Sequence, residues 1–315
     1  MKFALPIALF LLALAAPCAH ADVKQAKAAY ARGDYAAAVR AFRPLAQRGD
    51  AEAQFALGTM YREGKGVAKN EAEAVRWFRR AAGLGNELAQ FNLGRAYELG
   101  AGVERSDDAA VQWYRKAAEQ HLAQAQYNLG LMYASGRGVA KDPALAVEWW
   151  RRAAGQGLVN AQYSLGQAYA KGEGIAKDEA EAVSWFRQAA DRNDADAQCA
   201  VGYAYANGQG VEKDNAEAAK WFRKAAEQGA ASAQYNLGAL YMNGQGVDKN
   251  PAEAVNWWRR AAEQGYVSAQ FNLGAAYETG WGVAQDKAEA ARWYRKAAEQ
   301  GDADAKTKLE GLEKK

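Results

Sequence analysis

The sequence is poor in the residues on which catalysis and metal binding depend. Its 315 residues include two cysteines and two histidines, Cys18, Cys199, His20 and His121. Nucleophile–base pairs and clusters of metal ligands are built largely from these residue types. The motifs Ser-x-x-Lys, Gly-x-Ser-x-Gly and His-Glu-x-x-His do not occur in the sequence either. We therefore predict a protein that is not an enzyme and that has no catalytic, cofactor-binding or metal-binding residues.

The sequence also lacks a surplus of charge of either sign. It has 40 basic and 37 acidic residues, which gives a formal net charge of +3. Nucleic-acid binding depends on a dense cationic surface, so no nucleic-acid partner is expected. Beyond the N-terminal residues, no apolar run is long enough to cross a bilayer, so no membrane span is expected.

The N-terminus has the pattern of a secretory signal peptide. Lys2 is followed by an apolar run over residues 3–16 and by a small-x-small sequence at residues 19–21, which is typical of a cleavage site. We predict that residues 1–21 are a signal peptide and that the exported chain begins near Asp22.

Cysteine usage bears on the fate of that exported chain. Cys18 raises the alternative of a lipid anchor, which is disfavoured because Pro17 stands where a lipobox needs a small residue. After cleavage Cys199 would be the only cysteine, so an internal disulfide is excluded and stability must come from packing. Cys199 replaces an aromatic residue of the other repeats, and we predict that its thiol is structural.

One regularity dominates the rest of the sequence. The same phrase recurs every 36 residues, and its first copy reads Gln54-Phe-Ala-Leu-Gly-Thr-Met-Tyr61. A period of this length is typical of a solenoid, in which each unit packs on its neighbours and the stack presents a surface to partners. The glutamines that open the seven copies are Gln54, Gln90, Gln126, Gln162, Gln198, Gln234 and Gln270.

Each repeat has the apolar spacing of two helices. In the first half Ala53, Leu57 and Tyr61 recur every four residues, and in the second half Trp77 and Ala81 belong to a similar stripe. A Gly-x-Gly turn separates the halves. Residue types that cap helix N-termini open every second helix. These residues are Asn70, Ser106, Asp142, Asp178, Asp214, Asn250 and Asp286.

Other recurring positions also have a structural interpretation. A glycine follows most second helices, and His121 and Asn193 replace it twice. Both types tolerate a left-handed backbone, so His121 is interpreted as a helix-end residue. Gly58 and its equivalents predict a close approach between helices. Arg79 and its six equivalents follow an aromatic pair, and we expect their stems to cover aromatics and their heads to meet carboxylates or water.

The recurring phrase resembles the Sel-one-like repeat (SLR) family, which is related to the tetratricopeptide repeats. It reads Ala-x-Ala-Gln-x-x-Leu-Gly-x-x-Tyr-x-x-Gly-x-Gly-Val and then Ala-x-x-Trp-aromatic-Arg-x-Ala-Ala, over seven repeats in residues 50–301. Residues 22–49 resemble a tetratricopeptide-like N-terminal capping unit, and residues 302–315 look like a C-terminal capping helix. The resemblance implies an all-α fold, a right-handed α-α superhelical solenoid of helix-turn-helix repeats, and an adaptor role in assembling complexes.

Positions that vary between repeats are the better candidates for partner binding, because the scaffold does not dictate them. Two residues after the glutamine, four repeats carry an asparagine. By similarity to tetratricopeptide repeats, this position lines a concave groove, where an amide can pair with an extended peptide backbone. A solvated or locally bonded asparagine is the alternative. The candidates in this groove are Asn92, Arg95, Asn128, Gln167, Tyr203, Asn236 and Asn272.

Trp281 is a further candidate. It stands between Gly280 and Gly282, where no other repeat has an aromatic residue. An exposed tryptophan would be a binding anchor, and a tryptophan folded back onto its own repeat would be structural.

Taken together, these patterns predict an exported, non-enzymatic repeat scaffold that binds a protein or peptide partner in the bacterial envelope. The periplasm is the expected compartment, with secretion as the alternative, and a monomer is expected. Two other functions stay open. Some cysteine-rich members of the SLR family are exported and bind penicillin-related compounds, which suggests a cell-wall or β-lactam-related enzyme, although this chain lacks their cysteines. The other is a secreted factor that binds host proteins.

Overall fold

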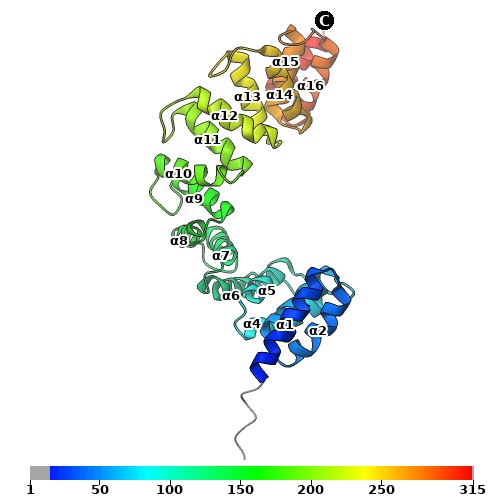
Figure 1. The fold of residues 1–315 in the computed structure, drawn as a ribbon. Coiled ribbons are helices and arrows are strands. Elements are labelled where there is room, and N and C mark those ends of the chain that lie inside the picture. Colours follow the sequence, from blue (N-terminus) through cyan, green and yellow to red (C-terminus); the bar gives the residue numbers. More distant parts are fainter. Residues whose placement is uncertain (1–14, 314–315) are drawn as a thin grey trace, which may run out of the picture. The chain divides into compact units, whose positions relative to one another are not determined.

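The structure, a computed structural model, describes residues 15–313, with side chains from residue 22 onward. Every regular element in this range is an α-helix (Figure 1). The predicted all-α class is therefore confirmed. The helices are α1(Ala15–Ala31), α2(Tyr35–Gln47), α3(Ala51–Glu63), α4(Glu71–Gly83), α5(Glu87–Leu99), α6(Asp107–Glu119), α7(Ala123–Ser135), α8(Pro143–Gly155), α9(Val159–Lys171), α10(Glu179–Ala190), α11(Ala195–Asn207), α12(Asn215–Glu227), α13(Ala231–Asn243), α14(Pro251–Glu263), α15(Val267–Thr279), α16(Lys287–Glu299) and α17(Ala303–Glu313).

The chain divides into two compact units, Met1–Ala153 and Ala154–Lys315, which we call unit 1 and unit 2. In unit 1, α1 packs on α2, α3 on α4 and α5 on α6, and each second helix also packs on the first helix of the next repeat. Unit 2 has the same arrangement from α9 to α16, and α17 packs on α16. Each unit is thus a stack of helix pairs, as expected of a repeat solenoid.

The N-terminal prediction falls largely outside this description. Residues 1–14 of the predicted signal peptide are not among the described residues, and α1 runs across the predicted cleavage point before Asp22.

The helix boundaries agree with the sequence prediction. The Asn70 side chain accepts a hydrogen bond from the Glu73 amide over 3.0 Å and so caps α4. First helices end at a glycine in the left-handed conformation, such as Gly64 with φ 71°. His121 and Asn193 both have φ 67°, which confirms His121 as a helix-end residue.

The repeated glutamines connect each repeat to the one before it. All seven are buried. The Gln234 Nε2 donates to the Ala226 carbonyl oxygen over 3.1 Å, and the other six make the same contact one repeat apart. Each glutamine gives a second hydrogen bond to a carbonyl at the end of a helix, which also accepts from the backbone amide three residues further on. The amide is therefore needed at this position for a structural reason.

The oxygen of the same glutamines accepts a hydrogen bond from a glutamine at the end of the second helix of the same repeat. Gln264 Nε2 donates to Gln234 Oε1 over 2.9 Å, and three other repeats have the equivalent pair. Repeat 1 has Leu84 in place of this donor. The buried Gln54 Oε1 consequently has no hydrogen-bond partner among the described residues.

The repeated arginines correct one expectation. Their heads were expected to meet carboxylates or water, but Arg79 Nη2 donates to the Tyr97 hydroxyl over 3.1 Å. Four further arginines of this series bond the tyrosine 18 positions ahead, in the first helix of the next repeat. The last of the series meets a carboxylate, where Arg295 contacts Glu313 over 2.8 Å. The sequence contains a signal for this contact, because a tyrosine recurs in every repeat as the arginine does.

The predicted close approach at the first-helix glycine is confirmed. A Cβ atom added to Gly58 would lie 2.6 Å from the Phe78 ring, and one added to Gly130 would lie 2.5 Å from Trp150 Nε1. The second glycine of the turns is closer still to its neighbour. A Cβ on Gly210, whose φ is 69°, would lie 2.1 Å from the Glu179 carbonyl oxygen of the preceding repeat.

Candidate functional site

One face of unit 1 carries side chains that differ from repeat to repeat. The residues two and five positions after each glutamine lie three apart, so they share one side of the first helix. All of them are half-buried or exposed. We call this set the first-helix face of unit 1. It consists of Ala56, Thr59, Asn92, Arg95, Asn128 and Leu131.

Two predicted residues of this face line one pocket. Asn92 and Arg95, both on α5, border a pocket of about 240 Å³ between α3, α4 and α5. Phe78 and Leu99 contribute apolar surface, and Arg62 contributes a second guanidinium. We call it the cationic pocket, because the acid that lines it, Glu71 on α4, is already in contact with Lys69 over 3.3 Å.

Asn92 is partly engaged with its own protein. Its Nδ2 donates to the Leu88 carbonyl oxygen over 2.7 Å, and its Oδ1 accepts from Arg62. A carboxamide has two N–H donors and two acceptor lone pairs, so one of each is still available to a partner. The local bonding that was the alternative for this asparagine is present, and it does not use up the group.

Arg95 is in a different position. It is exposed on the first-helix face, and no hydrogen bond or ion pair engages it within the described part of the chain. Other cations near it are paired, because Glu63 contacts Arg62 over 3.4 Å and Lys65 over 2.9 Å. The contact with Lys65 lowers the pKa of the Glu63 carboxyl. Arg95 is therefore the uncompensated positive charge of this pocket.

One repeat earlier, the equivalent space is apolar. This pocket of about 270 Å³ lies between α1, α2 and α3, with Tyr30, Phe42 and Phe55 in its lining. Ala56 and Thr59 stand where the cationic pocket has Asn92 and Arg95. We call it the apolar pocket. The charges at its edge, Lys27 and Glu52, pair with each other.

The Thr59 hydroxyl is notable in this pocket. Its Oγ1 is buried and has no hydrogen-bond partner within the described residues. An unsatisfied buried hydroxyl costs free energy, and this oxygen is closed to solvent.

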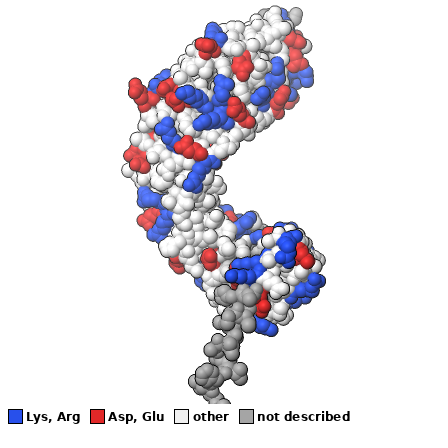
Figure 2. All heavy atoms as spheres, in the orientation of Figure 1, with Lys and Arg blue, Asp and Glu red and all other residues white. Residues whose placement is uncertain are grey.

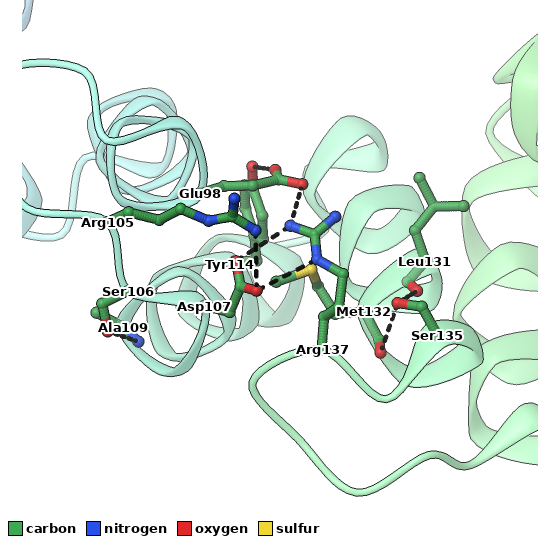
Figure 3. A network of polar contacts seen from close by, with 10 residues as sticks. All are labelled: Glu98, Arg105, Ser106, Asp107, Ala109, Tyr114, Leu131, Met132, Ser135 and Arg137. Atoms are coloured by element: carbon green, nitrogen blue, oxygen red, sulfur yellow. Dashed lines mark hydrogen bonds and ion pairs between the residues drawn. The ribbon is translucent and has the colours of Figure 1, made fainter.

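One repeat later, a polar network replaces the open pocket. Tyr114 is fully buried, and its hydroxyl donates to Glu98 Oε2 over 2.6 Å. Arg137, in the next turn, contacts Glu98 over 2.9 Å and Asp107 over 3.1 Å (Figure 3). Arg137 holds the pKa of Asp107 below its usual value. Burial, followed by the Glu98 carboxylate, raises the pKa of Tyr114, and the neighbouring Asn128 amide opposes this shift.

The candidates in unit 2 are arranged differently. Tyr203 and Asn236 are brought together, because the Asn236 Nδ2 donates to the Tyr203 hydroxyl over 2.7 Å. Gln167 lies beside the Tyr163 hydroxyl, whose pKa is raised mainly by burial. Asn272 makes no side-chain hydrogen bond within the described residues. These four residues line no shared pocket among those described.

Trp281 is exposed and contacts the preceding repeat. Its side chain is 53% exposed. The ammonium of Lys249, which belongs to the preceding repeat, lies 5.4 Å from the centre of its ring. Its role as a binding anchor stays a prediction.

Cys199 is a free and buried cysteine. Its Sγ lies 3.4 Å from the Ser232 hydroxyl, and burial raises the pKa of the thiol. A buried thiol with a raised pKa is a poor nucleophile, which agrees with the predicted structural role.

The sequence did not indicate Thr59, Arg62, Phe78 or Leu99 as site residues. A signal for Thr59 was present, since it occupies the same repeat position as Arg95 and Leu131. The contribution of Arg62 and Phe78 depends on how α3 and α4 pack against α5, which the repeat pattern alone does not reveal.

The surface has no region dominated by one sign of charge on the side drawn in Figure 2, where cationic and anionic side chains are interspersed. Among the described residues there is no group of three or more His, Cys, Asp or Glu side chains that could hold a metal ion. A helix long and apolar enough to span a membrane is likewise not found in that part of the chain.

The fold and this face define a class of protein, an all-α repeat solenoid whose variable residues gather on its first helices. The sequence pattern of the Sel1 repeat matches seven segments, and the chain belongs to the Sel1 repeat family. The matched segments are residues 51–86, 88–122, 123–158, 159–194, 195–229, 231–266 and 267–302.

Two solved structures are similar over almost the whole chain. One is a protective antigen present in uropathogenic Escherichia coli strains that displays an SLR fold. It is 36% identical with a TM-score of 0.89, and the match covers 93% of this chain and 64% of that one. The other is a Sel1 repeat protein from Oxalobacter formigenes, 33% identical with a TM-score of 0.74, covering 94% and 90%. No curated protein matches significantly.

Proposed function

We propose that the protein is an exported scaffold that binds another protein, and that it does so through the first-helix face of unit 1. The observation that carries this proposal is the contrast between conserved and varied positions within the chain. Glutamines, glycines, arginines and tyrosines that hold the stack together are repeated, whereas Thr59, Arg95 and Leu131 occupy one repeat position with three chemistries. Such variation is what selective recognition of a partner needs.

The size of the two pockets supports a protein partner over a small molecule. Sites for drug-sized ligands usually hold about 300–1,000 Å³. The pockets of about 240 and 270 Å³ are smaller and lie side by side in the repeat order, so each suits one side chain of a bound segment. The Sel1 repeat solenoid is in general a non-catalytic scaffold for protein–protein interaction, which agrees with this use.

Export is the second element of the proposal. It is supported by the signal-peptide pattern of residues 1–21. The similar structure from uropathogenic Escherichia coli is a protective antigen, which suits a protein located outside the cytoplasm. The periplasm or another part of the bacterial envelope is the compartment that we propose.

The proposal predicts the outcome of one capture experiment. Tagged protein isolated from an envelope fraction should have an intact mass that begins near Asp22, and it should retain a specific protein partner. Replacing both Asn92 and Asn128 by alanine should weaken that partner's binding by about 2–3 kcal/mol, taking roughly 1 kcal/mol for each hydrogen bond. The affinity is measured by titration calorimetry with the captured partner.

Unit 2 offers a matched control for this experiment. Asn236 and Asn272 occupy the same repeat position, and their double alanine variant should bind the partner with unchanged affinity. Equal losses from both pairs, or no loss from the first pair, would contradict a site on unit 1. A mass that includes residues 1–21, or a lipid on Cys18, would contradict the proposed export. Turnover of nitrocefin or muropeptides would favour the enzyme alternative instead.

A further inference from the structure

The two pockets of the first-helix face are equivalent in position and opposite in chemistry. The cationic pocket is built around Phe78, and the apolar pocket is built around Phe42, the residue 36 positions earlier. Of the three lining positions that correspond, two differ, because Asn92 and Arg95 in the cationic pocket replace Ala56 and Thr59 in the apolar pocket. Two neighbouring pockets that differ in this way can read two different side chains of one bound segment.

We infer that the partner segment is extended and carries an aromatic side chain and a carboxylate about three residues apart, with the aromatic ring in the apolar pocket and the carboxylate on Arg95. This inference rests on the proposed function and specifies its partner.

The carboxylate assignment follows from charge. Arg95 is exposed and has no ion pair within the described residues, whereas Arg62, the other cation in the lining, pairs with Glu63 over 3.4 Å. Glu71, the acid in the lining, already contacts Lys69. A guanidinium and a carboxylate form charge-assisted hydrogen bonds that are stronger than neutral ones, and Arg can make two of them at once. An acidic residue is therefore the complement of this pocket.

The aromatic assignment follows from the lining. Tyr30, Phe42 and Phe55 line the pocket, and the edge charges Lys27 and Glu52 neutralise each other. Aromatic pairs are stabilised beyond the burial of their area. An aromatic side chain should therefore be preferred over leucine here.

The spacing follows from the geometry of the stack. Packed helices lie about 8–10 Å apart, and Arg62 on α3 reaches Asn92 on α5 directly. An extended chain advances about 3.3 Å per residue. Neighbouring pockets are thus separated by about three residues of an extended segment. The half-engaged amide of Asn92 lies between them, where it can bond the backbone of that segment.

A library of random short peptides displayed on phage tests this inference on the purified full chain. Peptides retained by the protein should carry an aromatic residue and an Asp or Glu about three positions apart. Replacing Arg95 by threonine should lower the affinity of a selected peptide by about 10- to 100-fold, the range expected when a charged hydrogen bond is lost.

The repeats provide substitutions that exchange the two pockets. Thr59→Arg copies repeat 2 into repeat 1, and Arg95→Thr does the reverse. The same position tolerates Leu131, Gln167 and Tyr203 elsewhere in the chain, so both variants should fold, as circular dichroism would check. Selection on T59R should enrich peptides with two acids, and selection on R95T should enrich peptides with two apolar residues at the same spacing.

The possible failures are distinguishable. If peptides bind and the Asn92/Asn128 double variant weakens them, but T59R and R95T select the same sequences as the original chain, the aromatic–acidic pattern is wrong and the proposed function stands. If no selected peptide depends on the first-helix face at all, both the inference and the proposed site are wrong. If the selected sequences change as expected in T59R and in R95T, the result supports both the inference and the proposed function.

Discussion

Replacing Gly210 by alanine should destabilise the protein by about 2–5 kcal/mol. The new Cβ would lie 2.1 Å from the Glu179 carbonyl oxygen, and this is a backbone atom that cannot rotate away. The residue also has φ 69°, a left-handed conformation that costs an L-residue about 1–2 kcal/mol. Overpacking adds about 1–3 kcal/mol. Urea unfolding followed by circular dichroism measures the sum.

Gly208, in the same turn, is the matched control. Its φ of 72° is nearly the same, but the Cβ of an alanine there would lie 3.4 Å from the Lys213 Cβ, an ordinary contact. Gly208→Ala should therefore cost only the conformational part, about 1–2 kcal/mol. Equal losses of stability at the two positions would show that the close contact between the turn and the preceding repeat adds no cost, contrary to the packing described here.

Replacing Gln234 by leucine should destabilise the protein by about 1–3 kcal/mol, although leucine is the more hydrophobic residue. The substitution removes the side-chain hydrogen bond to the Ala226 carbonyl, which keeps its bond from the Gly229 amide, and it removes the acceptor for Gln264. The cost is that of two lost hydrogen bonds, at about 0.5–1.5 kcal/mol each. Unfolding in urea, compared with the original chain, measures this loss.

The hydrogen bonds between the glutamines, which we call the glutamine ladder, also predict one substitution that stabilises the protein. Leu84 is 57% exposed and stands where other repeats have the glutamine that donates to the ladder. Leu84→Gln should supply the missing partner for Gln54 Oε1 and stabilise the protein by about 1 kcal/mol. If Gln234→Leu is neutral, or if Leu84→Gln destabilises the protein, the glutamine ladder does not hold the repeats together in the way inferred from its bonds.

The sequence was sufficient to predict the helix pairs because their signals are local. Asn70 and its equivalents mark helix starts, and His121 occupies the position of a helix-end glycine; both predictions were confirmed. The close approach at Gly58 was also predictable, because a glycine inside a helix weakens it unless a neighbour needs the space.

Contacts between repeats were harder to predict. The Arg79 series was expected to meet carboxylates, whereas most of these arginines bond a tyrosine 18 positions ahead. The partner belongs to the next repeat, and a pattern along one helix does not identify it. The role of the seven glutamines was not evident for the same reason, since each bonds a carbonyl of the preceding helix.

The candidate site was predictable only in part. The stripe that contains Asn92 and Arg95 follows from helical spacing, and the structure places both residues in one pocket. The apolar pocket at Thr59 was not predicted, because alanine and threonine are unremarkable in a sequence and become informative only when the lining rings of Phe42 and Phe55 are seen. The partner-binding role expected from the sequence for Gln167, Tyr203, Asn236, Asn272 and Trp281 is untested, and the site proposed on unit 1 does not include these residues.

Site-specific photo-crosslinking in living cells tests the central claim most directly, namely that a protein partner binds the first-helix face of unit 1. A photoreactive residue at Leu131, which is 40% exposed on this face, should trap a protein other than the chain itself. The same residue at Gln112, exposed on the second helix α6, should trap little. Crosslinks from position 112 and none from position 131 would contradict the claim and place the binding surface on the second helices.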